Sequence, residues 1–299
     1  GMKAWVTKEV GKGKGLKLTN LLVAAKMNVM GSDAMKVGAD LANRFGAELS
    51  VISVMESTRS PERSNLEGGP CSGWVESQID RIRGFVDSEL KNVGKVPKLV
   101  QVSSGNPGSL IPTFARQTGA ELVVVGTHRS SGFESLLPGS SGEEIAEKAG
   151  VPVLAATREG SGPFRRILVA VDLSGHSQSL LDWASRLAWA DESEVRVIHS
   201  ERLLKRLGLG LTFRGDRTFR GPGWRRFMRL FWESDFPGHP QVILREGHPG
   251  RAVLREARSW DADLLVIGTG RFGLPFATRL GKTTKYLLRH SGRSILAVP

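Results

Sequence analysis

The chain has 299 residues, 40% of them hydrophobic, and a formal net charge of +12. That length is typical of two domains, since single domains usually hold about 100–200 residues. No apolar run reaches the roughly 18 residues that a membrane-spanning helix needs, and the amino terminus lacks the charged-then-apolar pattern of a signal peptide. Cys71 is the only cysteine, which excludes an intramolecular disulfide and favours a reducing setting. We therefore expect a cytoplasmic protein of two globular domains.

The positive charge is concentrated in the second half of the chain. Residues 1–160 contain 19 Lys and Arg against 17 Asp and Glu, whereas residues 161–299 contain 23 against 13. Such a field favours an anionic partner: a nucleotide, nucleic acid, phospholipid or acidic protein. Charge alone is equally consistent with a solvated basic face that keeps the protein soluble.

The first half opens with a basic arm at residues 1–18, which contains GKGKG. The continuous apolar run at 20–26 is typical of a strand buried on both faces of a sheet. The predicted elements that follow are an amphipathic helix (Ala34, Val37, Leu41), a strand near 48–54, a variable middle, a strand near 97–103, a helix opened by GNPG, the strand ELVVVG, a helix starting near Gly139 and the strand VPVLAAT. Alternating strands and helices of these lengths predict a parallel sheet with helices on both faces.

The second half repeats this series. Residues 20–54 shifted by 146 lie over 166–200 without a gap, and residues 105–157 shifted by 142 lie over 247–299. The predicted elements are a strand near 166–172, an amphipathic helix (Leu180, Trp183, Leu187), strands near 194–200 and 240–245, a helix opened by GHPG, the strand DLLVIG, a helix starting near Gly281 and the strand RSILAVP. Only the middles differ in length, so the sequence predicts an internal duplication.

We therefore expect an α/β protein of two tandem, doubly wound, five-stranded parallel-sheet domains. The expected parts are a basic arm at 1–18, domain one at 19–158, a linker at 159–164 and domain two at 165–299. In an open parallel sheet, ligands bind beyond the carboxyl ends of the strands, where the strand order reverses. In each domain that place is expected at the ends of the first and fourth strands.

The loop after the fourth strand carries the most specific motif. GTHRSSGFESLLPGSS in domain one and GTGRFGLPFATRLGKTT in domain two each lead from a glycine to a helix start. Glycines let backbone approach a phosphate, and a helix amino terminus supplies free N–H groups and a positive dipole. Both loops resemble that of the universal stress protein family, whose nucleotide-binding form has three spaced glycines followed by Ser or Thr, paired with an Asp that ends the first strand.

The resemblance covers about residues 19–157 and 165–299. It implies an adenine nucleotide alpha hydrolase-like fold, a role in the stress response and an ATP- or AMP-like ligand, with Mg²⁺ as a candidate companion. The implied ligand residues of domain two are Ala170, Val171, Asp172, Gly268, Thr269, Gly270, Arg271, Gly281, Lys282, Thr283 and Thr284. The weaker set in domain one is Gly126, His128, Arg129, Gly139, Ser140 and Ser141.

The two domains differ at positions that matter to this motif. Domain two has the strand-end Asp172, whereas domain one has Lys26 there. An arginine replaces the second glycine in both loops, at Arg129 and Arg271. Its side chain either fills the phosphate site, as in family members that do not retain ATP, or clamps an anion directly. The blocked interpretation is favoured for domain one; in domain two both stay open, because Lys282 and the following threonine stand at the helix start.

The sequence offers little support for catalysis beyond weak ATP hydrolysis. GKTT is not a P-loop, because that motif needs a glycine where Phe276 stands and should follow the first strand of its unit. The six histidines lack metal-ligand spacing, although His176 and His248 are expected near the ligand face of domain two.

The middle of domain two is strongly basic. Residues 201–230 contain nine Lys and Arg against two acids. Within it, Trp224, Phe227, Met228 and Phe231 fall at helical spacing, with Arg225, Arg226 and Arg229 on other faces. This pattern indicates either a basic amphipathic helix that meets anionic lipid or nucleic acid, or a helix whose aromatic stripe packs on the sheet; the second is favoured. Residues 202–231 remain a candidate contact for anionic lipid or an acidic partner.

The leading hypothesis is a cytoplasmic tandem universal stress protein that binds a nucleotide or other anionic small ligand, mainly in domain two, and acts through conformation or partner binding. Single-domain members pair as dimers, so by analogy the two units are expected to pack on each other, and a homodimer of the chain is a further candidate. The alternative is a scaffold without nucleotide binding, whose basic second domain docks an acidic protein, anionic lipid or nucleic acid. A nucleotide-hydrolysing enzyme is the third hypothesis.

Overall fold

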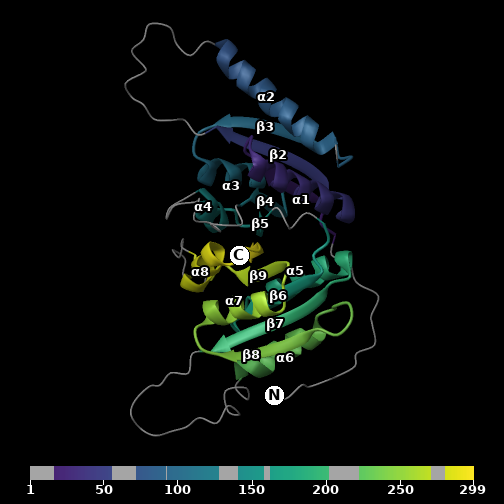
Figure 1. The fold of residues 1–299 in the computed structure, drawn as a ribbon, viewed down its shortest axis with the longest axis vertical. Coiled ribbons are helices and arrows are strands. Elements are labelled where there is room, and N and C mark those ends of the chain that lie inside the picture. The colour runs from purple at the N-terminus through teal and green to yellow at the C-terminus, as the bar shows by residue number, and fades with distance from the viewer. Residues whose placement is uncertain are drawn as a thin grey trace.

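The computed structural model describes residues 17–55, 72–91, 93–127, 141–157, 162–201, 222–270 and 280–299 (Figure 1). Domain one contains β1 (Asn20–Ala24), α1 (Val29–Phe45), β2 (Glu48–Met55), α2 (Ser72–Lys91), β3 (Leu99–Ser104), α3 (Pro107–Thr118), β4 (Leu122–Gly126), α4 (Ser141–Lys148) and β5 (Val153–Ala156). Domain two contains β6 (Arg166–Val171), α5 (Ser177–Asp191), β7 (Glu194–Glu201), α6 (Pro222–Glu233), β8 (Gln241–Glu246), α7 (Pro249–Ser259), β9 (Leu264–Gly268), α8 (Lys282–His290) and β10 (Ser294–Val298). The two series correspond element by element, which confirms the predicted tandem α/β architecture.

The strands form one ten-stranded sheet in the order β3-β2-β1-β4-β5-β10-β9-β6-β7-β8. Within each domain all neighbouring strands are parallel. The order reverses between β1 and β4 and again between β6 and β9, so each domain has one switch point at the carboxyl ends of those strands. The sheet is continuous because β5 and β10 pair antiparallel, with Leu296 opposite Leu154. The two domains therefore share a single sheet.

Helices cover both faces of this sheet, and each face has its own apolar core (Figure 1). One core joins α1, α2, α5 and α6 through Met35, Val86, Leu181 and Phe227. The other joins α3, α4, α7 and α8 through Phe114, Ile145, Leu254 and Leu287. Strands covered on both faces need apolar side chains at successive positions, which explains the uninterrupted apolar runs in the sequence.

Buried ion pairs add to the contact between the domains. Glu143, at the start of α4, is almost fully buried and accepts a hydrogen bond of 2.8 Å from the Nη2 of Arg289 on α8. Lys285 lies 3.4 Å from the same carboxylate. On the opposite face, Arg44 pairs with the buried carboxylate of Asp191, which also accepts a 2.7 Å hydrogen bond from the Phe164 N–H. The domain contact thus combines strand pairing with partnered buried charges, as buried charges require.

The aromatic stripe of α6 packs into the core. Phe227 and Phe231 are buried, Met228 is partly buried, and Arg225 and Arg229 are exposed. The favoured interpretation of this helix, core packing, is confirmed for these residues. Residues 1–16 of the basic arm and the arginine-rich segment 202–221 lie outside the described residues. Each described helix is too short or too polar to cross a membrane.

Candidate functional site

The switch point of domain two brings together the residues that the sequence singled out. Ala170 and Val171 end β6, Asp172 follows, and Gly268 ends the neighbouring strand β9. Gly281 caps α8, whose first residues are Lys282, Thr283 and Thr284. Arg271 lies outside the described residues. Apart from that arginine, the candidate residues of domain two occupy two adjacent strand ends and one helix start.

Two short hydrogen bonds to backbone carbonyls hold the start of α8 against the end of β9. The Gly281 N–H donates to the Thr269 carbonyl at 2.9 Å, and the Thr284 hydroxyl donates to the Gly268 carbonyl at 2.8 Å. Gly270 has φ +75°, in the left-handed region that favours glycine, and a Cβ there would lie 3.1 Å from the Gly281 Cα. Gly270 is therefore needed for this approach of loop to helix.

Several polar groups at this switch point have no side-chain partner among the described residues. The hydroxyl of Thr269 is buried without a hydrogen bond, as is that of Ser177 at the start of α5. Neither α5 nor α8 has a side-chain hydrogen bond at its N-cap. Asp172 is exposed, and its Oδ1 accepts a 3.0 Å hydrogen bond from the Ser174 N–H. Free helix N–H groups and a carboxylate that accepts hydrogen bonds offer complementary contacts to a phosphate and to a polyhydroxyl group.

The switch point of domain one is built differently. Helix α1 begins at Val29, whose counterpart is Gly175, two residues before α5 begins. The Asn28 Oδ1 caps α1 by accepting a 3.0 Å hydrogen bond from the Gly31 N–H. Because α1 begins two residues earlier than its counterpart, the Met30 carbonyl lies against Gly126. A Cβ at Gly126 would lie only 2.6 Å from the Met30 carbonyl carbon. Backbone thus fills the space beside the end of β4.

The equivalent glycine of domain two, Gly268, has room beside it. A Cβ there would lie 3.7 Å from the nearest heavy atom of the described residues, the Leu180 Cδ1. Thr127, the counterpart of Thr269, is also partnered, because its hydroxyl donates to the Ala156 carbonyl at 3.3 Å. Lys26 is exposed and Ser141 begins α4, while His128, Arg129, Gly139 and Ser140 lie outside the described residues. The two copies therefore differ in the space and free polar groups at this place.

One residue near the site of domain two was not predicted from the sequence. The Leu280 N–H, directly before the α8 cap, donates to the Glu147 Oε1 of domain one at 2.8 Å. Lys285 lies 3.7 Å from the same oxygen. No local pattern around Glu147 identifies this role, because the contact joins residues 133 positions apart.

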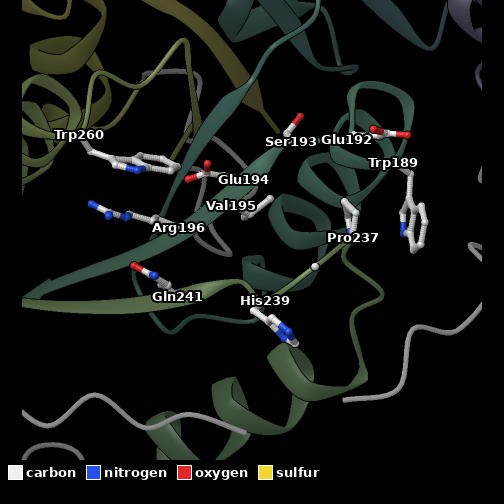
Figure 2. A pocket seen from close by; sticks show the side chains of 11 residues that line it. Trp189, Glu192, Ser193, Glu194, Val195, Arg196, Pro237, His239, Gln241 and Trp260 are labelled. Atoms are coloured by element: carbon white, nitrogen blue, oxygen red, sulfur yellow. The ribbon is translucent and has the colours of Figure 1, made fainter. Parts of the chain in front are cut away.

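The structure also contains a hollow that the sequence did not indicate. It has a volume of about 520 Å³ and lies at the amino ends of β7 and β8, the opposite end of these strands from the switch point (Figure 2). Trp189, Trp260 and His239 line it, and the Arg196 guanidinium lies 4.4 Å from the centre of the Trp260 ring. None of the candidate ligand residues lines this hollow.

Three of the described histidines lie in the core or at the start of a helix. His199 is buried, with its Nδ1 2.9 Å from the Val171 carbonyl oxygen. His176 and His248 are the N-caps of α5 and α7, and neither makes a side-chain cap hydrogen bond. Within the described ranges, no three His, Cys, Asp or Glu side chains gather closely enough to hold a metal ion.

Fold and site together define a tandem protein of two doubly wound α/β domains that share one sheet, with the candidate ligand residues of domain two gathered at its switch point. The model of the universal stress protein family matches residues 17–157 and 163–299. The chain therefore belongs to the universal stress protein family, with two domains of that family in tandem.

Curated relatives and solved structures agree with this assignment. A universal stress protein of Methanocaldococcus jannaschii is 28% identical over 132 residues, covering 42% of this chain and 74% of that protein. A universal stress protein A homolog of Pasteurella multocida is 26% identical over 140 residues, 46% of this chain and 96% of that protein. The crystal structure of a universal stress protein from Archaeoglobus fulgidus has a TM-score of 0.72 over 95% of this chain and 99% of that chain, at 18% identity. A functionally unknown protein from Pseudomonas aeruginosa has a TM-score of 0.65 over 94% and 92%, at 20% identity.

Proposed function

We propose that domain two binds an adenine nucleotide, or a related small ligand that carries phosphate, at the carboxyl ends of β6 and β9. Domain one acts as its structural partner. The observation that carries the proposal is the contrast between equivalent glycines: the Met30 backbone lies against Gly126, whereas among the described residues a Cβ at Gly268 would meet only ordinary van der Waals contacts. This contrast favours the strand ends of domain two over those of domain one as the place where a ligand binds.

The residues present there fit such a ligand. The exposed Asp172 carboxylate is suited to accept hydrogen bonds from the hydroxyls of a nucleoside, and ionised acceptors make the stronger hydrogen bonds. The uncapped N–H groups at the start of α8 and the Lys282 side chain are suited to phosphate oxygens. The buried, unpartnered Thr269 hydroxyl supports the same conclusion, since such groups in native proteins usually have a partner. A bound Mg²⁺ would take its oxygen ligands mainly from the phosphates, with Asp172 the nearest candidate carboxylate of this set.

The test compares two substitutions at equivalent positions. ATP and AMP are titrated by calorimetry into the wild-type protein, Asp172→Ala and Lys26→Ala. Asp172→Ala is expected to weaken binding by about tenfold or more, because a hydrogen bond to a charged group contributes about 1.5–3 kcal/mol. Lys26→Ala, an exposed side chain at the filled switch point, is expected to leave the affinity unchanged.

Mass spectrometry of material released by denaturing the purified protein provides an independent readout. A released adenine nucleotide whose amount falls in Asp172→Ala supports the proposal. Absence of both released nucleotide and binding heat in the wild-type protein refutes it. Equal loss of binding in the two variants would also contradict it, since the site would then not be confined to domain two.

A further inference from the structure

Helix α7 carries a row of arginines on its exposed side. Arg251, Arg255 and Arg258 stand at i, i+4 and i+7, so they lie on one face of the helix over about 10 Å of its length. Within the described residues none of them has a carboxylate partner, although the neighbouring basic side chains do. Arg196 and Arg245 both pair with Glu256, at 2.9 and 2.7 Å. The row is therefore a local excess of positive charge.

This row borders a shallow groove between α7 and α8, which pack side by side (Figure 1). The groove has a volume of about 610 Å³ and is lined by Arg251, Leu254, Arg255, Arg258, Ser259, Tyr286 and His290. The ring centres of Tyr286 and His290 are 4.6 Å apart, and His290 is exposed. Leu254 is buried, so the groove presents charged and aromatic side chains and no exposed aliphatic one.

Domain one shows what this surface looks like without these features. The shift of 142 places Ser109 and Thr113 at the first two arginine positions and Glu144 at the position of Tyr286. The Glu144 carboxylate packs against Gly108 and pairs with Lys148, the counterpart of His290. In domain two the Tyr286 ring packs against the equivalent Gly250. An acidic group in one copy is thus replaced by an aromatic ring in the other, beside two added positive charges.

We propose that the groove between α7 and α8 binds single-stranded nucleic acid. Guanidinium groups pair well with phosphate oxygens, and aromatic side chains provide platforms on which bases stack. An extended row of cations beside an exposed His290 ring and a half-buried Tyr286 ring is an arrangement suited to a single strand. An anionic membrane fits less well, because such surfaces insert apolar side chains and this groove exposes none. An acidic peptide would use the arginines but leave the aromatic rings without a role.

The probe is a fluorescent oligothymidylate of about 12 nucleotides, followed by anisotropy at salt concentrations between about 50 and 200 mM. The double variant Arg251→Ser/Arg255→Thr carries the domain-one residues at these positions. We expect it to bind at least tenfold more weakly and to lower the salt slope by about 1.4, the value for two lost phosphate contacts on a single strand. His290→Ala is expected to weaken binding by about tenfold without changing the slope, because stacking releases no counterions.

The matched control is Arg225→Ser/Arg229→Thr, which removes two exposed charges from α6 on the other face of the sheet. It is expected to change affinity less than threefold. Equal losses in the two double variants would overturn the proposal, because net charge alone would then explain binding. The proposal also fails if vesicles of anionic phospholipid bind while the oligonucleotide does not, or if polyglutamate competes as well as the oligonucleotide. Since all substituted residues lie outside the switch point, a failure here leaves the nucleotide proposal standing, and the reverse holds as well.

Discussion

Gly126 and Gly268 stand at equivalent places in the two domains, yet alanine should affect them very differently. In Gly126→Ala the added methyl would lie 2.6 Å from the Met30 carbonyl carbon and 3.2 Å from its Cα. These are backbone atoms, so no side-chain rotation can relieve the overlap. In Gly268→Ala the nearest atom would be the Leu180 Cδ1 at 3.7 Å, an ordinary van der Waals contact.

The expected cost follows from what must move. Relieving the overlap at Gly126 requires the first turn of α1 to retreat, which adds a typical overpacking cost of about 1–3 kcal/mol. The same movement weakens the Asn28 cap, worth about 1 kcal/mol. We therefore expect Gly126→Ala to lower the free energy of unfolding by about 2–4 kcal/mol. Gly268→Ala should lie within about 1 kcal/mol of wild type, since an alanine that fits also reduces the entropy of the unfolded chain.

Guanidinium unfolding of both variants, followed by circular dichroism, measures this difference. The calorimetric ATP titration adds a second test, because the methyl at Gly268 would point into the space assigned to the ligand. Gly268→Ala should then weaken nucleotide binding while remaining as stable as wild type. Equal stability of the two variants would refute the claim that backbone fills the switch point of domain one. A stable Gly268→Ala with unchanged affinity would refute the position of the ligand.

Three further predictions concern the fold. Glu143→Gln is expected to cost about 3 kcal/mol in the free energy of unfolding, because it removes the buried carboxylate that pairs with the partly buried Lys285 and Arg289 at the domain contact. Glu144→Gln in a half-exposed pair should cost at most about 1 kcal/mol; equal costs would contradict this. Phe227→Ala should cost about 3–5 kcal/mol in thermal melts, and the neighbouring Arg225→Ala no more than about 0.5 kcal/mol, since only the phenylalanine lies in the core. Asn106→Ala should cost about 1 kcal/mol by removing the cap of α3, and hydrogen exchange that stays unchanged in its first turn would argue against this role.

Much of the fold could be predicted because the sequence patterns that indicate it are local and occur twice. The apolar runs at 20–26 and 166–172 indicated buried strands, and the GNPG and GHPG turns marked the helix starts that the structure has at Pro107 and Pro249. The placement of the candidate residues could also be predicted, since Asp172 directly follows β6 and Gly268 ends the neighbouring strand β9. The doubly wound topology places the carboxyl ends of the first and fourth strands of a domain side by side, so residues at these two ends are expected to be neighbours.

Other features could not be predicted, because they depend on how distant segments pack. The helical spacing of the α7 arginines can be read from the sequence. Only the structure shows that the neighbouring Arg196 and Arg245 pair with Glu256, and that the α7 arginines border the aromatic rings of α8. The hydrogen bond from the Leu280 N–H to Glu147 joins residues from different domains. No pattern within either segment indicates such a contact.

The amino-acid sequence by itself determined the duplication, the alternation of strands and helices, and the end of each sheet at which a ligand would bind. Hydrophobic periodicity and turn residues act over a few positions, so they can be read from the sequence. Only the tertiary structure decided that the two domains join through β5 and β10, and that the Met30 backbone lies against Gly126 whereas the equivalent Gly268 has room for a Cβ among the described residues. Helix α1 begins two residues earlier than its counterpart, and because interiors are close-packed, one carbonyl group decides whether an added side-chain atom fits beside the strand end.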